Sequence, residues 1–500
     1  MSLRKNVIAN YLGQGWTGLI GLAFIPIYIE HLGIEAYALI GIFALLQAWL
    51  MLLDMGMTPT LNREMARFTA GAHTLQSIRD LLHSLEIICF AIATLIVVSM
   101  WIASGWLASD WLRAEKLPNV VVEQSISIMG GVAAMRFIEG IYRGAILGLQ
   151  KQVFFNLVHA FFATVRAVGA VAVLVWISPT IETYFVWQGV VSIISVIVFA
   201  VAAHKSLPAA PTPARFSRQA LLDIRHFAAG MMATTFLSLL LTQADKILLS
   251  RLISLVAFGY YALASTVALA ITLLITPITQ AFYPRFAEMV ARGDTEGLIR
   301  SYHRSAQLVT ALTAPGAFML IMFGQDVLLV WTGDEALAQE TAPLLALLAL
   351  GTLLNGLMHI PYMLQLAYGW PGFAARMNFV AVAFLVPAIL WATPHYGAIA
   401  AAWIWVLLNA GYVLIGIHFM YRRLLPNEKW RWYIQDVAVP VFATIVVASM
   451  FKAMQPDGLG PMLNVLWLIM TACMCWLGAL ASVYGHSYIG NSQILAKLKR

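Results

Sequence analysis

Three charged side chains interrupt the otherwise apolar run GGVAAMRFIEGIYRGAILG at residues 130–148. Arg136, Glu139 and Arg143 are spaced by three and four residues, so an α-helix places them on one face. A further cation, Arg166, falls in the middle of the next apolar stretch. A charge at bilayer depth costs roughly 3 kcal/mol or more, so such groups face a protein interior or a water-filled cavity. The pattern predicts a cationic cavity that receives an anionic substrate.

Arginine is well suited to bind phosphate, because its planar guanidinium donates two parallel hydrogen bonds and stays charged. Arg136 and Arg143 on one helix, with Arg166 on the next, can together cradle a pyrophosphate group. The alternative is structural: Glu139 pairs with Arg136 or Arg143, and the group only fastens helices together. That alternative neutralises one arginine and leaves a positive remainder. We therefore expect at least one of the arginines to contact substrate.

A second pair of charges, Asp245 and Lys246, lies in LTQADKILLSRL near the outer end of another apolar stretch. Adjacent helical residues point about 100° apart, so the two side chains serve different partners. Lys246 is a candidate substrate contact, and Asp245 is a candidate site for a coupling ion, H+ or Na+. The alternative for both is a salt bridge to a neighbouring helix, with Lys246 reaching the membrane interface.

Uncharged and titratable polar residues inside the apolar stretches have two possible roles. His159 and His359 relay protons or simply pack through hydrogen bonds. A set of amides either contacts sugar hydroxyls or joins helices. These amides are Gln14, Gln47, Asn156, Asn355, Asn378 and Asn409.

Signatures of enzyme and metal chemistry are absent from the sequence. It has no P-loop, GxSxG or HExxH motif and no aspartate-rich loop. Cys473 and Cys475 point about 200° apart on a helix and cannot share a metal ion. We expect no catalytic residue, no metal site and no cofactor other than a coupling ion.

The composition identifies the elements that position these charges. Hydrophobic residues make up 61% of the 500 residues and charged residues only 11%, against roughly 25% charged in soluble domains. Apolar stretches long enough to span a bilayer recur along the chain. We expect an all-α polytopic membrane protein with about fourteen transmembrane helices, at 10–29, 36–56, 82–104, 124–148, 155–177, 182–203, 227–250, 256–281, 305–325, 340–366, 375–393, 397–420, 434–452 and 462–484.

The basic residues indicate the orientation of these helices. With both termini in the cytoplasm, 22 of the 30 Lys and Arg residues fall on the cytoplasmic side. Four lie within the membrane, and four lie outside: Arg113, Lys116, Arg251 and Lys452. This alternation supports the number of spans. It also accounts for the net charge of +7, so we expect no nucleic-acid partner.

The chain divides into two halves in this interpretation. AYAL and a later EM, beginning at residues 36 and 64, recur as YYAL and EM with an offset of 224 residues. We expect two six-helix bundles related by a pseudo-two-fold axis along the membrane normal. The expected parts are an N-terminal bundle at 1–203, a cytoplasmic linker at 204–222, a C-terminal bundle at 223–421, and two additional helices with a cytoplasmic tail at 422–500.

Several motifs resemble a known family. LLQAWLMLLDMGMTPTLNREMARF (45–68) contains a D-x-G turn at Asp54 and Gly56, followed by Arg63. This segment, the stretch 32–39 and the sequence QADKILLSRL resemble bacterial polysaccharide-unit flippases of the Wzx type. These flippases belong to the multidrug/oligosaccharidyl-lipid/polysaccharide exporter superfamily. Asp54 itself has a structural interpretation: it accepts hydrogen bonds from amides beyond Gly56, or it pairs with Arg63 or Arg67.

The resemblance implies a flippase of the bacterial inner membrane. Its substrate would be an oligosaccharide repeat unit on undecaprenyl pyrophosphate, for example an O-antigen or exopolysaccharide unit, moved to the periplasmic leaflet by alternating access. Membrane lipids, a polysaccharide polymerase and a chain-length regulator are the implied partners.

Three other functions compete with this one. A lipid II flippase or a multidrug/cation antiporter would share the fold. A cation exporter requires acids in its cavity, whereas the intramembrane balance here is four bases against two acids. A membrane-bound polymerase or ligase requires a sizeable outer loop with catalytic residues, which the expected topology does not provide.

Overall fold

The computed structural model describes residues 13–498, apart from residues 14, 70, 72, 209–211, 457 and 459. Within these residues the chain is helical, and its single β interaction is an isolated parallel bridge between Arg113 and Ser254. The expected all-α polytopic fold is therefore confirmed. Gln14, which was a candidate amide, lies outside the described residues.

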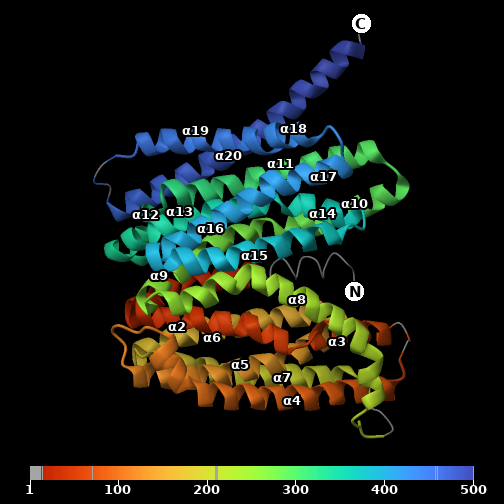
Figure 1. The fold of residues 1–500 in the computed structure, drawn as a ribbon, viewed down its shortest axis with the longest axis vertical. Coiled ribbons are helices and arrows are strands. Elements are labelled where there is room, and N and C mark those ends of the chain that lie inside the picture. The colour runs from red at the N-terminus through yellow and green to blue at the C-terminus, as the bar shows by residue number, and fades with distance from the viewer. Residues whose placement is uncertain are drawn as a thin grey trace. The chain divides into compact units, whose positions relative to one another are not determined.

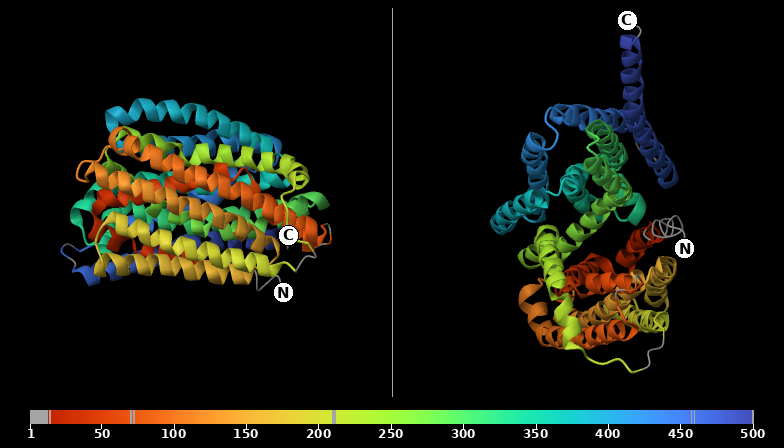
Figure 2. Two further views of the ribbon diagram at one scale, coloured as in Figure 1. Left: turned by 90° about the horizontal axis from the view of Figure 1, so that it is seen from below. Right: turned by 90° about the vertical axis from the view of Figure 1, so that its right-hand side faces the viewer.

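Packing divides the chain into two compact units, Met1–Gly259 and Tyr260–Arg500. The helices of the first unit run side by side (Figures 1 and 2). They are α2 (Ile25–Leu53), α3 (Met57–Thr69), α4 (Leu75–Trp106), the π-helical turn η1 (Leu107–Trp111), α5 (Asn119–Gly148), α6 (Gln152–Trp176), α7 (Ile181–Ser206) and α8 (Arg218–Leu252). Helix α9 (Leu255–Leu269) crosses the division between the units.

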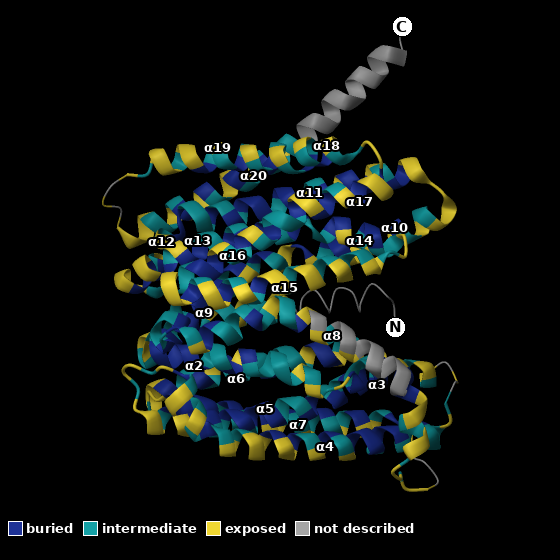
Figure 3. Cartoon of the chain, viewed as in Figure 1, coloured by how far each residue is buried: buried dark blue, intermediate teal, exposed yellow. Residues whose placement is uncertain are grey.

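The second unit contains the remaining helices. They are η2 (Ala270–Leu274), α10 (Thr276–Arg292), α11 (Thr295–Met322), α12 (Gly324–Thr332), α13 (Glu335–Leu357), α14 (His359–Ala367), α15 (Pro371–Tyr396), α16 (Ala398–Gly411), η3 (Tyr412–Gly416), α17 (Ile417–Arg423), α18 (Lys429–Arg431), η4 (Trp432–Ala438), α19 (Val439–Ala453) and α20 (Pro461–Leu498). In each unit, exposed residues recur along one face of helices such as α4 and α19 (Figure 3).

Twelve helices within the described residues are long and apolar enough to cross a membrane. Each covers one of the fourteen spans expected from the sequence. Of the other two, 227–250 lies inside helix α8, and 10–29 lies partly outside the described residues. Gly33 interrupts helix α2 with a φ of 79°, a left-handed conformation that favours glycine. This break falls between the first two expected spans. The total of fourteen and the pseudo-symmetry stay predictions.

The segment between α7 and α8 is shorter than the expected linker at 204–222. Helix α7 continues to Ser206, and α8 begins at Arg218, where the Ser217 hydroxyl accepts a hydrogen bond from the amide of Ala220. Helix α8 packs against α2, α3 and α4 and therefore belongs to the first compact unit. The four-part division of the chain stays a prediction.

Segments expected on the same side of the membrane lie together in the first unit. On the expected outer side, the amide of Leu255 donates to the carbonyl of Arg113 at 2.9 Å. On the expected cytoplasmic side, the amide of Arg215 donates to the Asp80 carboxylate at 2.8 Å. The contacts agree with the alternation of loops that the basic residues indicate.

The D-x-G turn connects α2 to α3. Both Asp54 carboxylate oxygens accept from the amide of Thr58 at 3.1 Å, and one accepts from its hydroxyl at 2.7 Å. Gly56 has a φ of 74°. Asp54 therefore accepts hydrogen bonds from beyond Gly56, as the first of its two structural interpretations predicts. Arg63 and Arg67 pair with Glu64.

Small residues bring α3 close to the helix that carries the charges. A Cβ atom at Gly144 of α5 would lie 2.8 Å from the carbonyl oxygen of Thr58, and one at Gly148 would collide with the carbonyl of Asn62. Glycines at this four-residue spacing let two membrane helices approach closely. The D-x-G turn and these glycines together hold α5 in place.

A buried histidine joins the segment 428–436 to helix α11 within the second unit. His303 on α11 contacts the Asp436 carboxylate through Nδ1 and the Glu428 carboxylate through Nε2, the latter at 2.9 Å. Gln307 donates to the other Asp436 oxygen at 2.9 Å, and Arg431 pairs with Glu428 at 3.4 Å. His303 therefore links α11 to two acidic side chains of the segment 428–436.

We predict that His303→Ala destabilises the second unit by about 1–3 kcal/mol, because it leaves the buried Asp436 carboxyl group without its His303 hydrogen-bond partner. Thermal unfolding of the purified protein in detergent measures the effect. The control is His395→Ala, which removes an exposed histidine of α15. Equal unfolding temperatures for the two variants would contradict the fastening role of His303.

Candidate functional site

Glu139 lies at the centre of the charged cluster. Its side chain is 3% exposed, on the face of α5 that meets α6 and α7. One carboxylate oxygen accepts from Arg166 of α6 at 3.0 Å and from the hydroxyl of Ser195 of α7 at 2.8 Å. The other oxygen lies 3.9 Å from Arg143. A buried carboxylate therefore ties three helices together.

Arg136 is held by neutral groups. Its Nη1 donates to Gln47 of α2 at 3.0 Å, and its Nη2 donates to Gln188 of α7 at 2.9 Å. Its guanidinium carbon lies 5.1 Å from the centre of the Phe43 ring, a cation–π contact. Among the ion pairs of the described residues, none within 4.0 Å includes Arg136. Its buried Nε and the buried Nε2 of Gln47 make no hydrogen bond.

Arg143 is more accessible than Arg166. Its side chain is 38% exposed, against 13% for Arg166. The guanidinium carbon of Arg143 lies 5.2 Å from the centre of the Phe155 ring, and His159 stacks on the same ring at 5.4 Å. Arg143 is therefore positioned to meet a ligand, whereas Arg166 is already occupied.

Helix α7 also binds the backbone of α6. Gln188 Nε2 donates to the carbonyl of Arg166 at 3.4 Å, and Trp187 Nε1 donates to that of Val165 at 3.3 Å. Gly169 of α6 leaves the space that the Trp187 ring occupies. Gln188 thus orients Arg136 while it contacts the helix that carries Arg166.

The cluster retains positive charge after these pairings. Three guanidinium groups and one carboxylate leave a formal charge of +2. The i,i+3 pair of Glu139 with Arg136 is not among the described ion pairs, and the i,i+4 pair with Arg143 is long. The shortest pairing of Glu139 is with Arg166, on another helix. The arrangement provides cationic donors for an anionic group.

The other candidates have different surroundings. Lys246 Nζ lies 3.5 Å from Gln243 Oε1 on α8, and neither Lys246 nor Asp245 belongs to the hydrogen-bonded cluster of Glu139. Both stay predictions. In the second unit the candidate amides join helices: Asn355 donates to Asn409 at 2.9 Å, and the Tyr412 hydroxyl donates to Asn378 at 2.9 Å.

Two residues of the site did not emerge from the sequence. Gln188 is the one amide in the stretch YFVWQGVVSII, and its polarity there is a signal comparable to that of Gln47. Ser195 carries no such signal, because serines that bond to their own helix are common in apolar helices. Only the fold shows that its hydroxyl reaches Glu139.

An all-helical membrane bundle with a buried cationic cluster is typical of a polytopic transporter. The chain belongs to the polysaccharide biosynthesis protein family, whose sequence model matches residues 3–290. The resemblance to polysaccharide-unit flippases is thereby confirmed.

Individual relatives agree with this family. The putative O-antigen transporter of Shigella flexneri is 19% identical over 82% of this chain and 96% of its own length. The succinoglycan biosynthesis transport protein ExoT of Rhizobium meliloti (strain 1021) is 27% identical over 39% of this chain and 42% of its own. Both of these relatives are transporters by name.

Solved structures share the fold. The lipid II flippase MurJ in an inward closed conformation matches with a TM-score of 0.70 at 11% identity, over 97% of this chain and 99% of that one. An inward-facing multidrug transporter of the MATE family matches with a TM-score of 0.66 at 14% identity, over 82% and 94% of the two chains.

We predict that Glu139 and Arg166 are energetically coupled. In a double-mutant cycle of Glu139→Gln and Arg166→Gln, the interaction energy is about 1–3 kcal/mol, because the pair is buried and hydrogen-bonded. The matched cycle of Glu139→Gln with Arg143→Gln gives less than about 1 kcal/mol, because that pair is longer and partly exposed. Unfolding free energies in detergent measure both. Equal couplings would contradict the assigned pairing.

Proposed function

We propose that the protein is a flippase for oligosaccharide repeat units linked to undecaprenyl pyrophosphate. It moves them from the cytoplasmic to the periplasmic leaflet by alternating access through a cationic cavity. The single observation that carries this proposal is the state of Arg136, a half-buried guanidinium that donates to two neutral amides and forms no ion pair with a carboxylate of the described residues. Family membership supports the polysaccharide-related substrate.

The arrangement of the cluster supports binding of a pyrophosphate. Glu139, which also accepts a hydrogen bond from Ser195, holds Arg166 in place, so Arg166 is a positioning residue. Arg136 and Arg143 lie seven residues apart on one helix face, about 10 Å along the axis. An anionic head group meets the exposed Arg143 first and Arg136 deeper in the bundle. A guanidinium group donates two hydrogen bonds to a phosphate in a fixed geometry, and the ammonium group of a lysine cannot reproduce that geometry.

The formal charge of +2 argues against a multidrug or cation antiporter, because a cationic substrate needs acids in its site. A lipid II flippase shares both the fold and the anionic lipid carrier, and substrate profiling separates it from the proposed function. The fold comparisons support neither choice over the other, because their sequence identities are low.

Further parts of the proposal concern the cell. The protein lies in the bacterial inner membrane with its N- and C-termini in the cytoplasm. A polysaccharide polymerase and a chain-length regulator act beside it. An ion gradient of H+ or Na+ drives transport, with Asp245 as the coupling site and Lys246 as a further substrate contact. No part of the mechanism makes or breaks a covalent bond, so we propose that the protein is not an enzyme.

We predict that Arg136→Ala lowers surface glycan by roughly tenfold or more, because a charge-assisted hydrogen bond to the substrate contributes about 1.5–3 kcal/mol. Arg143→Ala has the same direction. Arg136→Lys restores activity only in part, since an ammonium loses the bidentate contact. Glycan on intact cells is measured by gel staining, with membrane insertion checked by immunoblot.

The control for these variants is Arg300→Ala, which removes a cytoplasmic arginine that is 71% exposed on α11. It leaves glycan unchanged. Arg166→Ala is less informative, because it also strips Glu139 of its partner and so lowers stability. Normal glycan in both the Arg136 and the Arg143 variants would overturn the cationic-cavity mechanism.

A further inference from the structure

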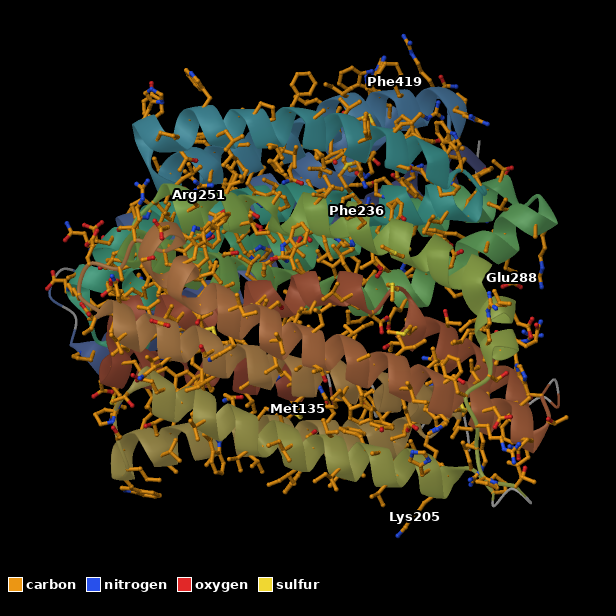
Figure 4. The ribbon with its side chains drawn as sticks, turned by 60° about the horizontal axis from the view of Figure 1, so that its bottom comes forward. Met135, Lys205, Phe236, Arg251, Glu288 and Phe419 are labelled. Carbon is orange, nitrogen blue, oxygen red and sulfur yellow. The ribbon has the colours of Figure 1, made fainter. Side chains whose placement is uncertain are left out.

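A crevice of about 390 Å³ lies in the first unit, where the start of α6 meets the end of α7. Its lining residues are Lys151, Val153, Phe154, Ala202, Lys205 and Ser206. Lys205 projects from the end of α7, at the end of the first unit opposite to Arg251 (Figure 4). None of the lining residues belongs to the arginine cluster, so the crevice is a separate site.

The polar side of the crevice is cationic. Lys151 Nζ donates to the hydroxyl of Ser206 at 2.8 Å, and Lys205 lies in the last turn of α7. Neither lysine takes part in an ion pair within 4.0 Å among the described residues. Helix α6 begins beside them without a side-chain cap, so the positive end of its dipole adds to their charge.

The apolar side of the crevice continues into two exposed stripes. Those stripes follow helical spacings of three, four and seven residues. On α6 they are Phe154, Leu157, Phe161 and Val168, and on α7 they are Val190, Ile194, Ile197 and Val201. Lys205 is the next position of the α7 stripe. Exposed apolar stripes on membrane helices face lipid tails. The crevice therefore sits where an acyl chain meets its head group.

The distribution of basic residues places Lys151 and Lys205 on the cytoplasmic side. The cytoplasmic leaflet is rich in anionic lipids, which bind basic pockets between membrane helices. We propose that this crevice binds the head-group phosphate of an anionic phospholipid of the cytoplasmic leaflet, with the acyl chains along the two stripes. The lysines hold the phosphate, and Ser206 orients Lys151. This proposal does not depend on the transported substrate.

Charge and shape favour a bilayer lipid over the polyprenyl-linked substrate. Lys205 and Phe154 are exposed. The guanidinium forks of the proposed transport site, suited to a pyrophosphate, are absent from the crevice. Two lysines act as point charges that match a single phosphodiester.

The test uses the full-length protein in detergent and native mass spectrometry. Dioleoylphosphatidylglycerol, dioleoylphosphatidylcholine, undecaprenyl phosphate and inorganic phosphate are titrated separately. The wild type binds phosphatidylglycerol more tightly than phosphatidylcholine. Lys151→Gln with Lys205→Gln weakens phosphatidylglycerol binding by roughly 30-fold, from about 1 kcal/mol per lysine. Lys151→Arg with Lys205→Arg retains it, which excludes loss of folding as the cause.

The control variant Arg292→Gln with Arg300→Gln removes two exposed cytoplasmic charges outside the crevice and leaves binding unchanged. Unchanged phosphatidylglycerol affinity in the Lys→Gln pair would overturn the proposal. So would equal affinities for phosphatidylcholine and phosphatidylglycerol, or a lysine-dependent preference for undecaprenyl phosphate. Displacement of the lipid by inorganic phosphate at equal concentration would show that the apolar stripes play no part, and would also refute it.

Discussion

The buried carboxylate of Glu139 is the interaction on which the arrangement of the first unit depends. A charge in a low-dielectric interior is stable only with a partner and hydrogen bonds. Arg166 and Ser195 supply both, from α6 and α7. These contacts fix the positions of α5, α6 and α7 relative to one another. Gln188 therefore accepts a hydrogen bond from Arg136 of α5 and donates one to the backbone of α6. The arrangement of the candidate site therefore follows from the hydrogen bonds and the ion pair that the buried Glu139 carboxylate requires.

The same requirement is met differently in the second unit. There the imidazole of His303 and the guanidinium of Arg431 face the carboxyl groups of Asp436 and Glu428, so two basic side chains meet two acidic ones. That cluster is balanced, whereas the cluster of the first unit keeps a charge of +2. A balanced cluster fastens helices. A cluster with more basic than acidic groups retains hydrogen-bond donors for a ligand. This excess distinguishes a binding site from a group of side chains that only holds helices together.

Much of the framework was predictable from the sequence. The spans emerge from runs of apolar residues, and twelve of the expected fourteen coincide with membrane-length helices of the described residues. The turn at Asp54 and Gly56 was predictable because capping involves residues four apart in the chain. The division of the chain into structural units was harder to predict from the sequence. The length of α8 and its packing depend on neighbours that are distant in sequence.

The sequence by itself determined twelve membrane-length helices of the described residues and the face of α5 that carries Arg136, Glu139 and Arg143, and it predicts the alternation of the helices across the membrane. These properties are local, since hydropathy, loop charge and helical period involve neighbouring residues. Only the tertiary structure decided the partner of Glu139. The sequence offers Arg136 and Arg143 on the same helix, whereas the arginine closest to Glu139 is Arg166 on α6. The tertiary structure also decided that Arg136 donates to amides of α2 and α7 and pairs with no carboxylate of the described part of the chain, since those amides come from distant segments.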